Sequence, residues 1–314
     1  MLINRIYARR VGAVLGITCL GLAAAACSSS SSSSSSSAST PASSPSSSPT
    51  ATALPSGDVD VFSAGSLDTL MTKTVGPAFH AATGYTLVDT SHGSGTLESD
   101  IKNKVAVADV FVSASPADVA GLVGASNGNW TTWYASFAAS PEVLGYYPKS
   151  KFAKDLQTMP WYKVITLPGF RLGRTDPSQD PGGVLAAEAL NETATAQNLP
   201  ALKTLATEQS DVYSEDPEEA DIQTGQLDAA FMYEADANSQ DSPFVPLTGT
   251  SLAGDYTITL LTNAPHMAAA EAFINFLLGP TGQAEMKADN FEIVSPAKVT
   301  GTGVPSALSS VLGS

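Results

Sequence analysis

The sequence predicts an α/β protein whose two lobes form a clamshell, on three observations. First, strand-like apolar runs alternate with helix-like patterns along most of the chain, which is typical of parallel sheets covered by helices. Second, the chain completes one such unit, continues into another and returns to the first, so that two crossovers would join the lobes. Third, residues 57–314 are numerous enough to bury two cores. A hinged pair of lobes places a ligand in the cleft between them.

Three strand–turn–helix units are expected in the first lobe. The run "DVDVFSA" predicts a strand, and a helical pattern follows it over residues 66–79, with apolar side chains at Leu67, Leu70, Met71, Val75 and Phe79. A strand over residues 85–88 precedes a Gly/Ser turn and a helix that begins near Ser94. A third strand over residues 109–113 precedes a helix that Pro116 could open.

The second lobe repeats this alternation. A strand in "EVLGYYPKS" leads into it, a Pro/Gly/Asp loop precedes a helix from about Gly182, and a buried strand ends at Tyr233. The stretches "DYTITLLTNA" and "MAAAEAFINFLLG" predict the strand and helix that return to the first lobe. We therefore assign residues 57–142 to the first part of lobe 1, 143–234 to lobe 2, and 235–314 to the return and a C-terminal tail.

The first 56 residues are typical of an export signal and a tether. Basic residues precede an apolar run over residues 11–26, which is too short to span a bilayer and ends in alanines. The stretch "LAAAAC" resembles the lipobox of bacterial lipoproteins, although Ala24 stands where leucine is commoner, so we expect a signal peptide over residues 1–26 and lipidation of Cys27. The alternative is a plain secretory signal with an incidental cysteine. A flexible Ser/Pro-rich tether would occupy the rest of residues 27–56.

Charge and cysteine content limit the function further. Cleavage before Cys27 would remove Arg5, Arg9 and Arg10 and leave twelve basic against thirty acidic residues, a net charge of −18. Such a chain is a poor partner for nucleic acid or anionic membranes. Anion binding remains possible, because helix N-termini and backbone N–H groups favour anions locally. Cys19 lies in the signal, so no internal disulfide is expected.

Two strand-end turns are candidates for an anion site. At Gly65-Ser66 and Gly93-Ser94-Gly95 a strand delivers the chain to a helix N-terminus, where unpaired N–H groups and a serine hydroxyl can donate to an oxyanion. Each serine alone could equally be a helix cap. As a pair facing one cleft, Ser66 and Ser94 predict an oxyanion site without lysine or arginine.

No catalytic constellation is recognisable. The three histidines are scattered, and His92 alone stands beside a candidate site. No metalloprotease, P-loop, dinucleotide-binding or nucleophile-elbow motif accompanies the serines. We therefore expect no enzymatic activity and no cofactor. A secreted hydrolase that uses Ser66 or Ser94 is the alternative from another functional class.

Several stretches together resemble the tungstate/molybdate-binding proteins of ABC importers. These are "VFSAGSL", "SHGSGTL", "ADVFVSAS", "GRTDPSQDPGG", "VYSEDPEEADIQTGQLDAAFMYEADA" and "FINFLLGPTGQ", in that order over about residues 59–291. The stretch "TDPSQDPGG" is most similar to an archaeal-like branch in which carboxylates join the neutral donors around the metal. The resemblance implies the type II periplasmic binding protein fold.

The resemblance also implies a set of site residues. The two family serines fall on Ser66 and Ser94, an aspartate on Asp180 with the Gly182 N–H near the oxyanion, and a tyrosine on Tyr233. The family glutamate falls on Glu219. Because the segment from Glu219 to Tyr233 is about three residues shorter than the family pattern, Glu218 or Glu215 could take its place. Without the resemblance, Asp180 would be a turn residue and Glu219 part of a solvated helix face.

Carboxylates beside a dianion require a specific chemistry. Asp180 and Glu219 would repel the anion unless they approach tungsten or molybdenum itself and expand its coordination, which sulfur and phosphorus do not allow. The resemblance thus implies an extracytoplasmic lipoprotein, anchored to the cell membrane, that acts as a monomer and delivers tungstate or molybdate as cargo to an ABC permease. Tungstate and molybdate are too alike for the sequence to separate. A binding protein for sulfate, phosphate or an organic acid is the alternative within this class.

Overall fold

The computed structural model describes residues 54–313, and within this range it leaves the side chains of residues 215–219 undescribed. The expected signal peptide, Cys27 and most of the expected tether lie outside the described residues. Within 54–313, no helix is long and apolar enough to cross a membrane. The described residues 54–313 belong to one compact unit, and the following description concerns that unit alone.

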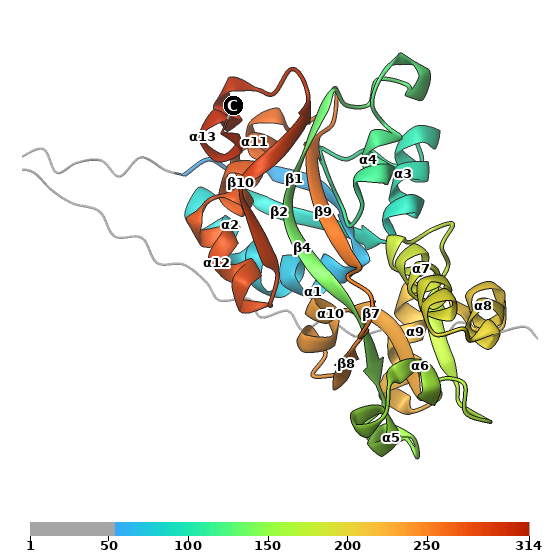
Figure 1. Ribbon diagram of the computed structural model, residues 1–314. Helices are drawn as coiled ribbons and strands as arrows, with labels where there is room; N and C mark the ends of the chain where they lie inside the picture. The colour runs from blue at the N-terminus through green and yellow to red at the C-terminus, as the bar shows by residue number, and fades with distance from the viewer. Residues whose placement is uncertain (1–53, 314) are drawn as a thin grey trace, which may run out of the picture. The chain divides into compact units, whose positions relative to one another are not determined.

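Six strands form the first half of a mixed sheet (Figure 1). Its parallel part has the order β2-β1-β3, and β9 and β4 continue it in antiparallel fashion, with β10 paired to β4. The strands are β1 (Asp58–Ala64), β2 (Thr86–His92), β3 (Val110–Ser113), β4 (Trp133–Tyr146), β9 (Ala253–Leu260) and β10 (Glu292–Gly301). We call these strands, with the helices that cover them, the first half.

The long strand β4 continues into the second half of the sheet. There β7 pairs with β4 in antiparallel fashion, β5 and β6 extend the sheet in parallel, and β8 pairs in antiparallel fashion with the opposite edge of β4. The added strands are β5 (Leu172–Thr175), β6 (Val212–Tyr213), β7 (Ala229–Tyr233) and β8 (Phe244–Pro246). Strand β4 is therefore shared by both halves.

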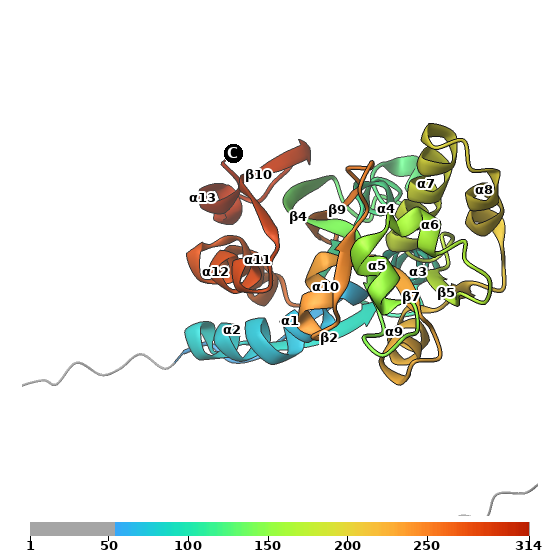
Figure 2. The same cartoon turned by 60° about the horizontal axis from the view of Figure 1, so that its bottom comes forward.

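Helices cover both halves, and Figures 1 and 2 show α11, α12 and α13 beside β10, and α5 to α8 around the second half. The first half carries α1 (Asp68–Leu70), α2 (Gly76–Thr83), α3 (Ser94–Asn103), α4 (Pro116–Ala120), α11 (Met267–Leu278), α12 (Pro280–Ala288) and α13 (Ser309–Leu312). The second half carries α5 (Ala153–Thr158), α6 (Trp161–Val164), α7 (Pro181–Ala196), α8 (Pro200–Thr207), α9 (Glu215–Thr224) and α10 (Glu234–Ser239).

The helical pattern expected over residues 66–79 is confirmed, but the helix is not uniform. A wide turn over Met71–Val75 separates α1 from α2, and the Gly76 N–H donates to the Met71 carbonyl five residues earlier. Pro77 follows directly and has no N–H to donate to the preceding turn, which accounts for the irregularity. All five apolar residues of the pattern, from Leu67 to Phe79, are buried.

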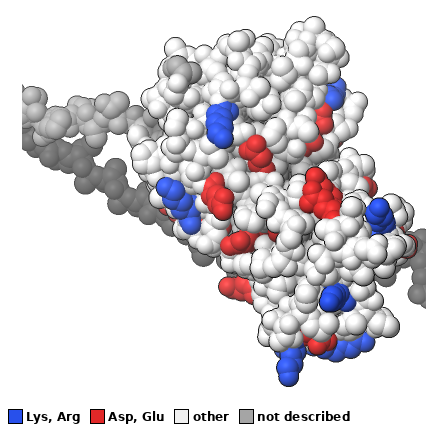
Figure 3. Space-filling view, viewed as in Figure 1, with Lys and Arg blue, Asp and Glu red and all other residues white. Residues whose placement is uncertain are grey.

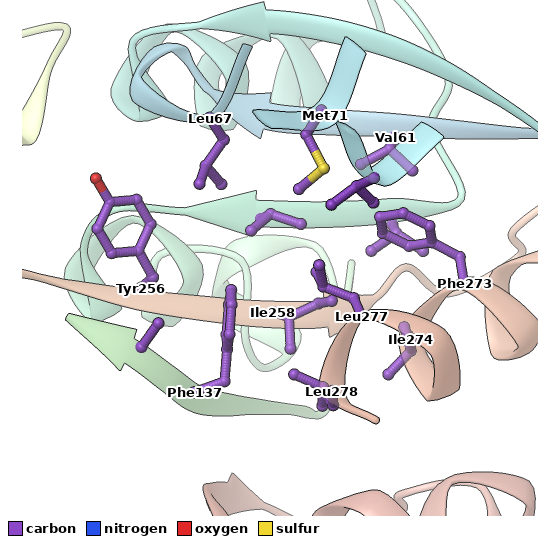
Figure 4. Packing of buried hydrophobic residues seen from close by; sticks show 14 of the residues in the cluster. Val61, Leu67, Met71, Phe137, Tyr256, Ile258, Phe273, Ile274, Leu277 and Leu278 are labelled. Atoms are coloured by element: carbon purple, nitrogen blue, oxygen red, sulfur yellow. The ribbon is translucent and has the colours of Figure 1, made fainter. Parts of the chain in front are cut away.

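Each half has its own core. In the first half, side chains of α2 and α11 pack on β1, β3 and β9, and Figure 4 shows Met71, Phe273 and Ile258 meeting in this layer. The Tyr256 ring lies at the edge of that cluster, with its hydroxyl directed away from it (Figure 4). The second core surrounds Trp161 and Leu190 between the sheet and α6 and α7. The apolar layers hold the strand ends in position for a site.

Candidate functional site

The predicted site residues follow the carboxyl ends of parallel strands. Ser66 comes after β1, Ser94 after β2 and Asp180 after β5, while Tyr233 is the last residue of β7. In open α/β sheets, ligands bind outside these strand ends, where loops lead into helix N-termini. In both halves the predicted site residues therefore lie at the carboxyl ends of the parallel strands.

The Ser66 hydroxyl is held by a tyrosine of the first half. Ser66 Oγ and the Tyr256 hydroxyl lie 2.8 Å apart and share a hydrogen bond. The Tyr256 ring also packs edge-on against Tyr233, with ring centroids 5.8 Å apart. Ser66, which follows β1, is therefore linked through Tyr256 to Tyr233 of the second half.

Ser94 opens α3 and is completely buried. Its Oγ accepts a hydrogen bond of 3.1 Å from the Ala114 N–H, which ties the start of α3 to the end of β3. The hydroxyl proton of Ser94 remains to be donated elsewhere. The serine is thus both a structural acceptor and a potential donor to a ligand.

The glycines beside Ser94 allow the second half to approach. A Cβ on Gly93 would lie 2.6 Å from the Gln179 carbonyl oxygen and 3.2 Å from the Asp180 Cβ, and one on Gly95 would lie 3.0 Å from the same carbonyl. The Thr96 N–H donates to that carbonyl at 3.1 Å. The turn predicted as an anion site thus receives the Gln179 backbone in the structure.

Asp180 precedes α7, which begins at Pro181, one residue before the expected Gly182. Burial raises the pKa of the Asp180 carboxyl, while the Thr175 hydroxyl and the backbone N–H groups of Gly182 and Gly183 act in the opposite direction. Gly182 is itself buried against this carboxyl, since a Cβ there would lie 3.0 Å from Asp180 Oδ2. The carboxyl is thus placed at a helix N-terminus, as the sequence predicted.

Tyr233 is 4% exposed, and its hydroxyl has no hydrogen-bond partner within the described part of the chain. Burial raises the pKa of Tyr233 well above its usual value, and the neighbouring Asp180, Tyr256 and Glu142 raise it further. A Cβ on Gly254 would lie 2.7 Å from the Tyr233 ring, so the ring needs this glycine beside it. A buried phenol without a partner is a ready donor for a ligand.

The sequence analysis missed Glu142. This residue of β4 lies directly opposite Tyr233 in the β4–β7 pairing and is 3% exposed. Burial, and after it the charge of Asp180, raises the pKa of its carboxyl well above the usual value. A glutamate within an otherwise apolar strand pattern was the available signal, but the sequence does not show which residue it faces.

Glu219, Glu218 and Glu215 lie on α9, but their side chains are outside the described residues. The start of α9 adjoins a cavity of about 140 Å³, which is lined from the first half by His92, Gly93 and Thr96, and from the second by Asp180, Tyr213 and Ser214 among others. A second cavity, of about 370 Å³, includes Asp180, Ala114 and Asp255 in its lining. The assignment of Glu219 stays a prediction.

Two features bear on the alternative functions. Ser66 hydrogen-bonds to Tyr256 and Ser94 to the Ala114 N–H, and within the described residues neither serine hydrogen-bonds to a histidine. On the face shown in Figure 3, lysines and arginines are scattered and do not form a patch.

Comparisons with known proteins agree on one family and one fold. The model of the family described as bacterial extracellular solute-binding protein matches residues 59–292. A solute-binding protein of Petrotoga mobilis is 24% identical over 277 residues, covering 77% of this chain and 85% of that protein. A molybdate/tungstate-binding protein of Thermococcus kodakarensis is 22% identical over 220 residues, covering 54% of this chain and 62% of that protein.

A solved structure supports the fold assignment. The periplasmic molybdate-binding protein of Azotobacter vinelandii superposes with a TM-score of 0.60 at 19% identity, covering 76% of this chain and all of that one. At this identity the likeness concerns the fold alone. The predicted two-lobed, type II periplasmic binding protein fold is confirmed.

Proposed function

Because this chain belongs to the family of bacterial extracellular solute-binding proteins, we propose that it captures tungstate or molybdate for an ABC importer. The names of the Thermococcus and Azotobacter proteins support an oxyanion of this kind. In this proposal the two halves close on the anion, and the closed form docks on a membrane permease. The protein binds and releases its ligand without transforming it.

The observation that carries the proposal is the position of Asp180. Asp180, a half-buried residue at the N-terminus of α7, lies next to Gly93 at the N-terminus of α3, and its charge raises the pKa of Tyr233. Ser94 and Tyr233 are neutral donors that suit a tetrahedral oxyanion. A carboxylate among such donors fits an anion only if it approaches the central atom.

The central atom then decides which anions are accepted. Tungsten and molybdenum can take further oxygen ligands beyond the four of the oxyanion, so a carboxylate can become one of them. Sulfur and phosphorus cannot, so sulfate or phosphate would meet the negative charge of Asp180 without compensation. The same residue would thus favour one class of oxyanion and reject the other.

We further propose that the mature protein is a monomer on the outer side of the membrane, held by a lipid on Cys27 and the serine-rich tether. The lipobox-like stretch before Cys27 supports this placement. A tether lets the body reach its permease while remaining attached. Glu219, with Glu218 or Glu215 as alternatives, is retained as a proposed ligand from α9.

Calorimetry of residues 54–314 with tungstate, molybdate, sulfate and phosphate in parallel tests the function. We expect tight binding of tungstate and molybdate, and binding of sulfate and phosphate that is weaker by orders of magnitude. Preference for sulfate or phosphate would instead identify a binding protein for another small anion. Absence of binding to all four would overturn the proposed ligand class.

A further inference from the structure

Glu142 occupies the position in β4 where the strand passes from one half of the sheet to the other. The last β4–β9 pair in this direction joins Pro141 to Ala253, and the first β4–β7 pair joins Glu142 to Tyr233. The Glu142 N–H donates to the carbonyl of Leu252, the residue just before β9, at 2.9 Å, while Tyr233, the residue opposite Glu142, belongs to the second half. The residue thus lies at the junction that any closing motion must involve.

The Glu142 side chain is buried without a partner. Only 3% of the residue is exposed, and neither Oε1 nor Oε2 has a hydrogen-bond partner among the residues that the structure describes. The hydroxyl of the facing Tyr233 is equally unpartnered. Buried polar groups in folded proteins are nearly always satisfied, and a carboxyl is among the costliest to leave unsatisfied. Two adjacent unsatisfied groups indicate that something else completes this site.

The neighbours of Glu142 are acidic or neutral. The charge of Asp180 raises the pKa of Glu142, and Asp180, Tyr256, Glu142 and Asp236 all raise that of Tyr233. Asp180 reaches this place from the loop before α7, so the two carboxyls come from separate parts of the chain. Both carboxyls act on the pKa of Tyr233, and two carboxylates near one phenol repel each other unless an electropositive centre lies between them. The hexavalent metal of tungstate or molybdate is such a centre.

We propose that Glu142 is a ligand residue of the oxyanion site and contacts the metal of the bound anion together with Asp180. This inference rests on the proposed function and adds to it a residue on β4 that the sequence analysis did not consider. Because Glu142 lies where the two halves join, its contact with the ligand would also couple binding to the closed arrangement of the halves. A carboxylate that contacts the metal from this position would affect the selectivity among oxyanions as well as the affinity for tungstate.

The test uses Glu142→Gln, which keeps the size of the side chain and removes its charge. We expect the Kd for tungstate to rise at least tenfold, while the Kd for sulfate stays the same or falls because a repelling carboxylate has gone. The melting temperature of the ligand-free variant should equal or exceed that of the parent, since the amide cannot carry a buried, unpaired charge. Glu188→Gln, which removes an exposed carboxylate of α7, is the matched control and should bind like the parent.

A second measurement keeps the inference testable if Glu142→Gln perturbs the fold. In an absorption-edge spectrum of the tungstate complex, Glu142→Leu should show fewer oxygen neighbours around tungsten than the parent. Unchanged tungstate affinity in Glu142→Gln, or an equal loss for tungstate and sulfate, would overturn the role of Glu142 while leaving the proposed function intact. A parent protein that binds neither tungstate nor molybdate would instead overturn the proposed function itself.

Discussion

The hydroxyls of Ser66 and Tyr256 share a hydrogen bond of 2.8 Å that joins the end of β1 to the middle of β9. Since a serine hydroxyl has one proton and two acceptor positions, the Tyr256 phenol can donate to Ser66 while Ser66 donates to a ligand. The tyrosine therefore orients the serine, and the aromatic contact with Tyr233 extends this arrangement to the second half.

Removing the Ser66 hydroxyl should weaken oxyanion binding. A hydrogen bond to a charged group contributes about 1.5–3 kcal/mol, so Ser66→Ala should raise the Kd for tungstate about ten- to a hundred-fold. Tyr256→Phe, which keeps the ring and removes only the orienting hydroxyl, should have a smaller effect. Calorimetry of both variants measures this, and a Ser66→Ala protein that binds like the parent would reduce Ser66 to a structural residue.

The sign of the effect at Asp180 separates two roles. If the carboxylate contacts the metal, Asp180→Ala lowers tungstate affinity; if it only lies near the anion, the same change raises affinity by relieving repulsion. We expect weaker binding in Asp180→Ala and also in Asp180→Asn, which keeps the size of the side chain. Tighter binding by both variants would remove Asp180 from the coordination of the metal and favour a sulfate-like ligand.

Gly93 should be needed for the approach of the two halves. A methyl group there would lie 2.6 Å from the Gln179 carbonyl oxygen, against 3.0 Å at Gly95. Crowding of this kind costs about 1–3 kcal/mol, so Gly93→Ala should raise the Kd for tungstate roughly tenfold, and Gly95→Ala should raise it less. Small-angle scattering with ligand should show a less compact Gly93→Ala protein, and identical profiles for variant and parent would contradict this explanation.

Asp89 on β2 should make stability depend on pH. Burial raises its pKa from 3.8 to about 7, although the Ser63 hydroxyl donates to it at 3.1 Å. The folded state therefore keeps a proton that the unfolded chain loses, and stability falls as the pH rises through this window. Asp89→Asn stays neutral, so its melting temperature should exceed that of the parent by more at about pH 8 than at about pH 5.

The exposed Glu192→Gln variant on α7 is the control for this comparison, because an exposed carboxylate should shift the melting temperature by similar amounts at both pH values. A difference between Asp89→Asn and the parent that stays constant from acid to alkaline pH would show that Asp89 does not titrate in this range.

Processing of the N-terminus can be checked by mass spectrometry of membrane-extracted protein. We expect the mature chain to begin at Cys27 and to carry acyl groups, because basic, apolar and small residues precede this cysteine in the order of a lipoprotein signal. Cys27→Ser should release the protein from the membrane fraction or block processing. An intact Met1 terminus, or an unmodified Cys27, would contradict lipidation.

The local sequence pattern was enough to predict where the candidate residues Ser66, Ser94 and Asp180 lie relative to the strands and helices. Ser66, Ser94 and Asp180 each stand where a strand passes into a helix, and a strand followed by Gly, Ser or Pro is visible in the chain itself. The alternation of predicted strands and helices likewise indicated the α/β class, because such elements can bury their apolar faces in only a few arrangements. The local sequence pattern could not predict that Gly93 packs on the Gln179 backbone, since that contact joins residues far apart in the sequence.

The local sequence pattern by itself determined that this chain forms strands followed by turns that lead into helix N-termini, where a ligand could bind. Hydrophobic periodicity and turn chemistry act over only a few residues, so a short stretch of sequence is enough to predict them. Only the tertiary structure decided which side chains meet behind those turns. Glu142 faces Tyr233 because β4 and β7 pair in one register, and a shift of one residue would have turned the carboxyl to the other face of the sheet. Tyr256 reaches Ser66 because β9 runs antiparallel beside β3. Strand register is set by the packing of both cores at once, and no short stretch of sequence contains it.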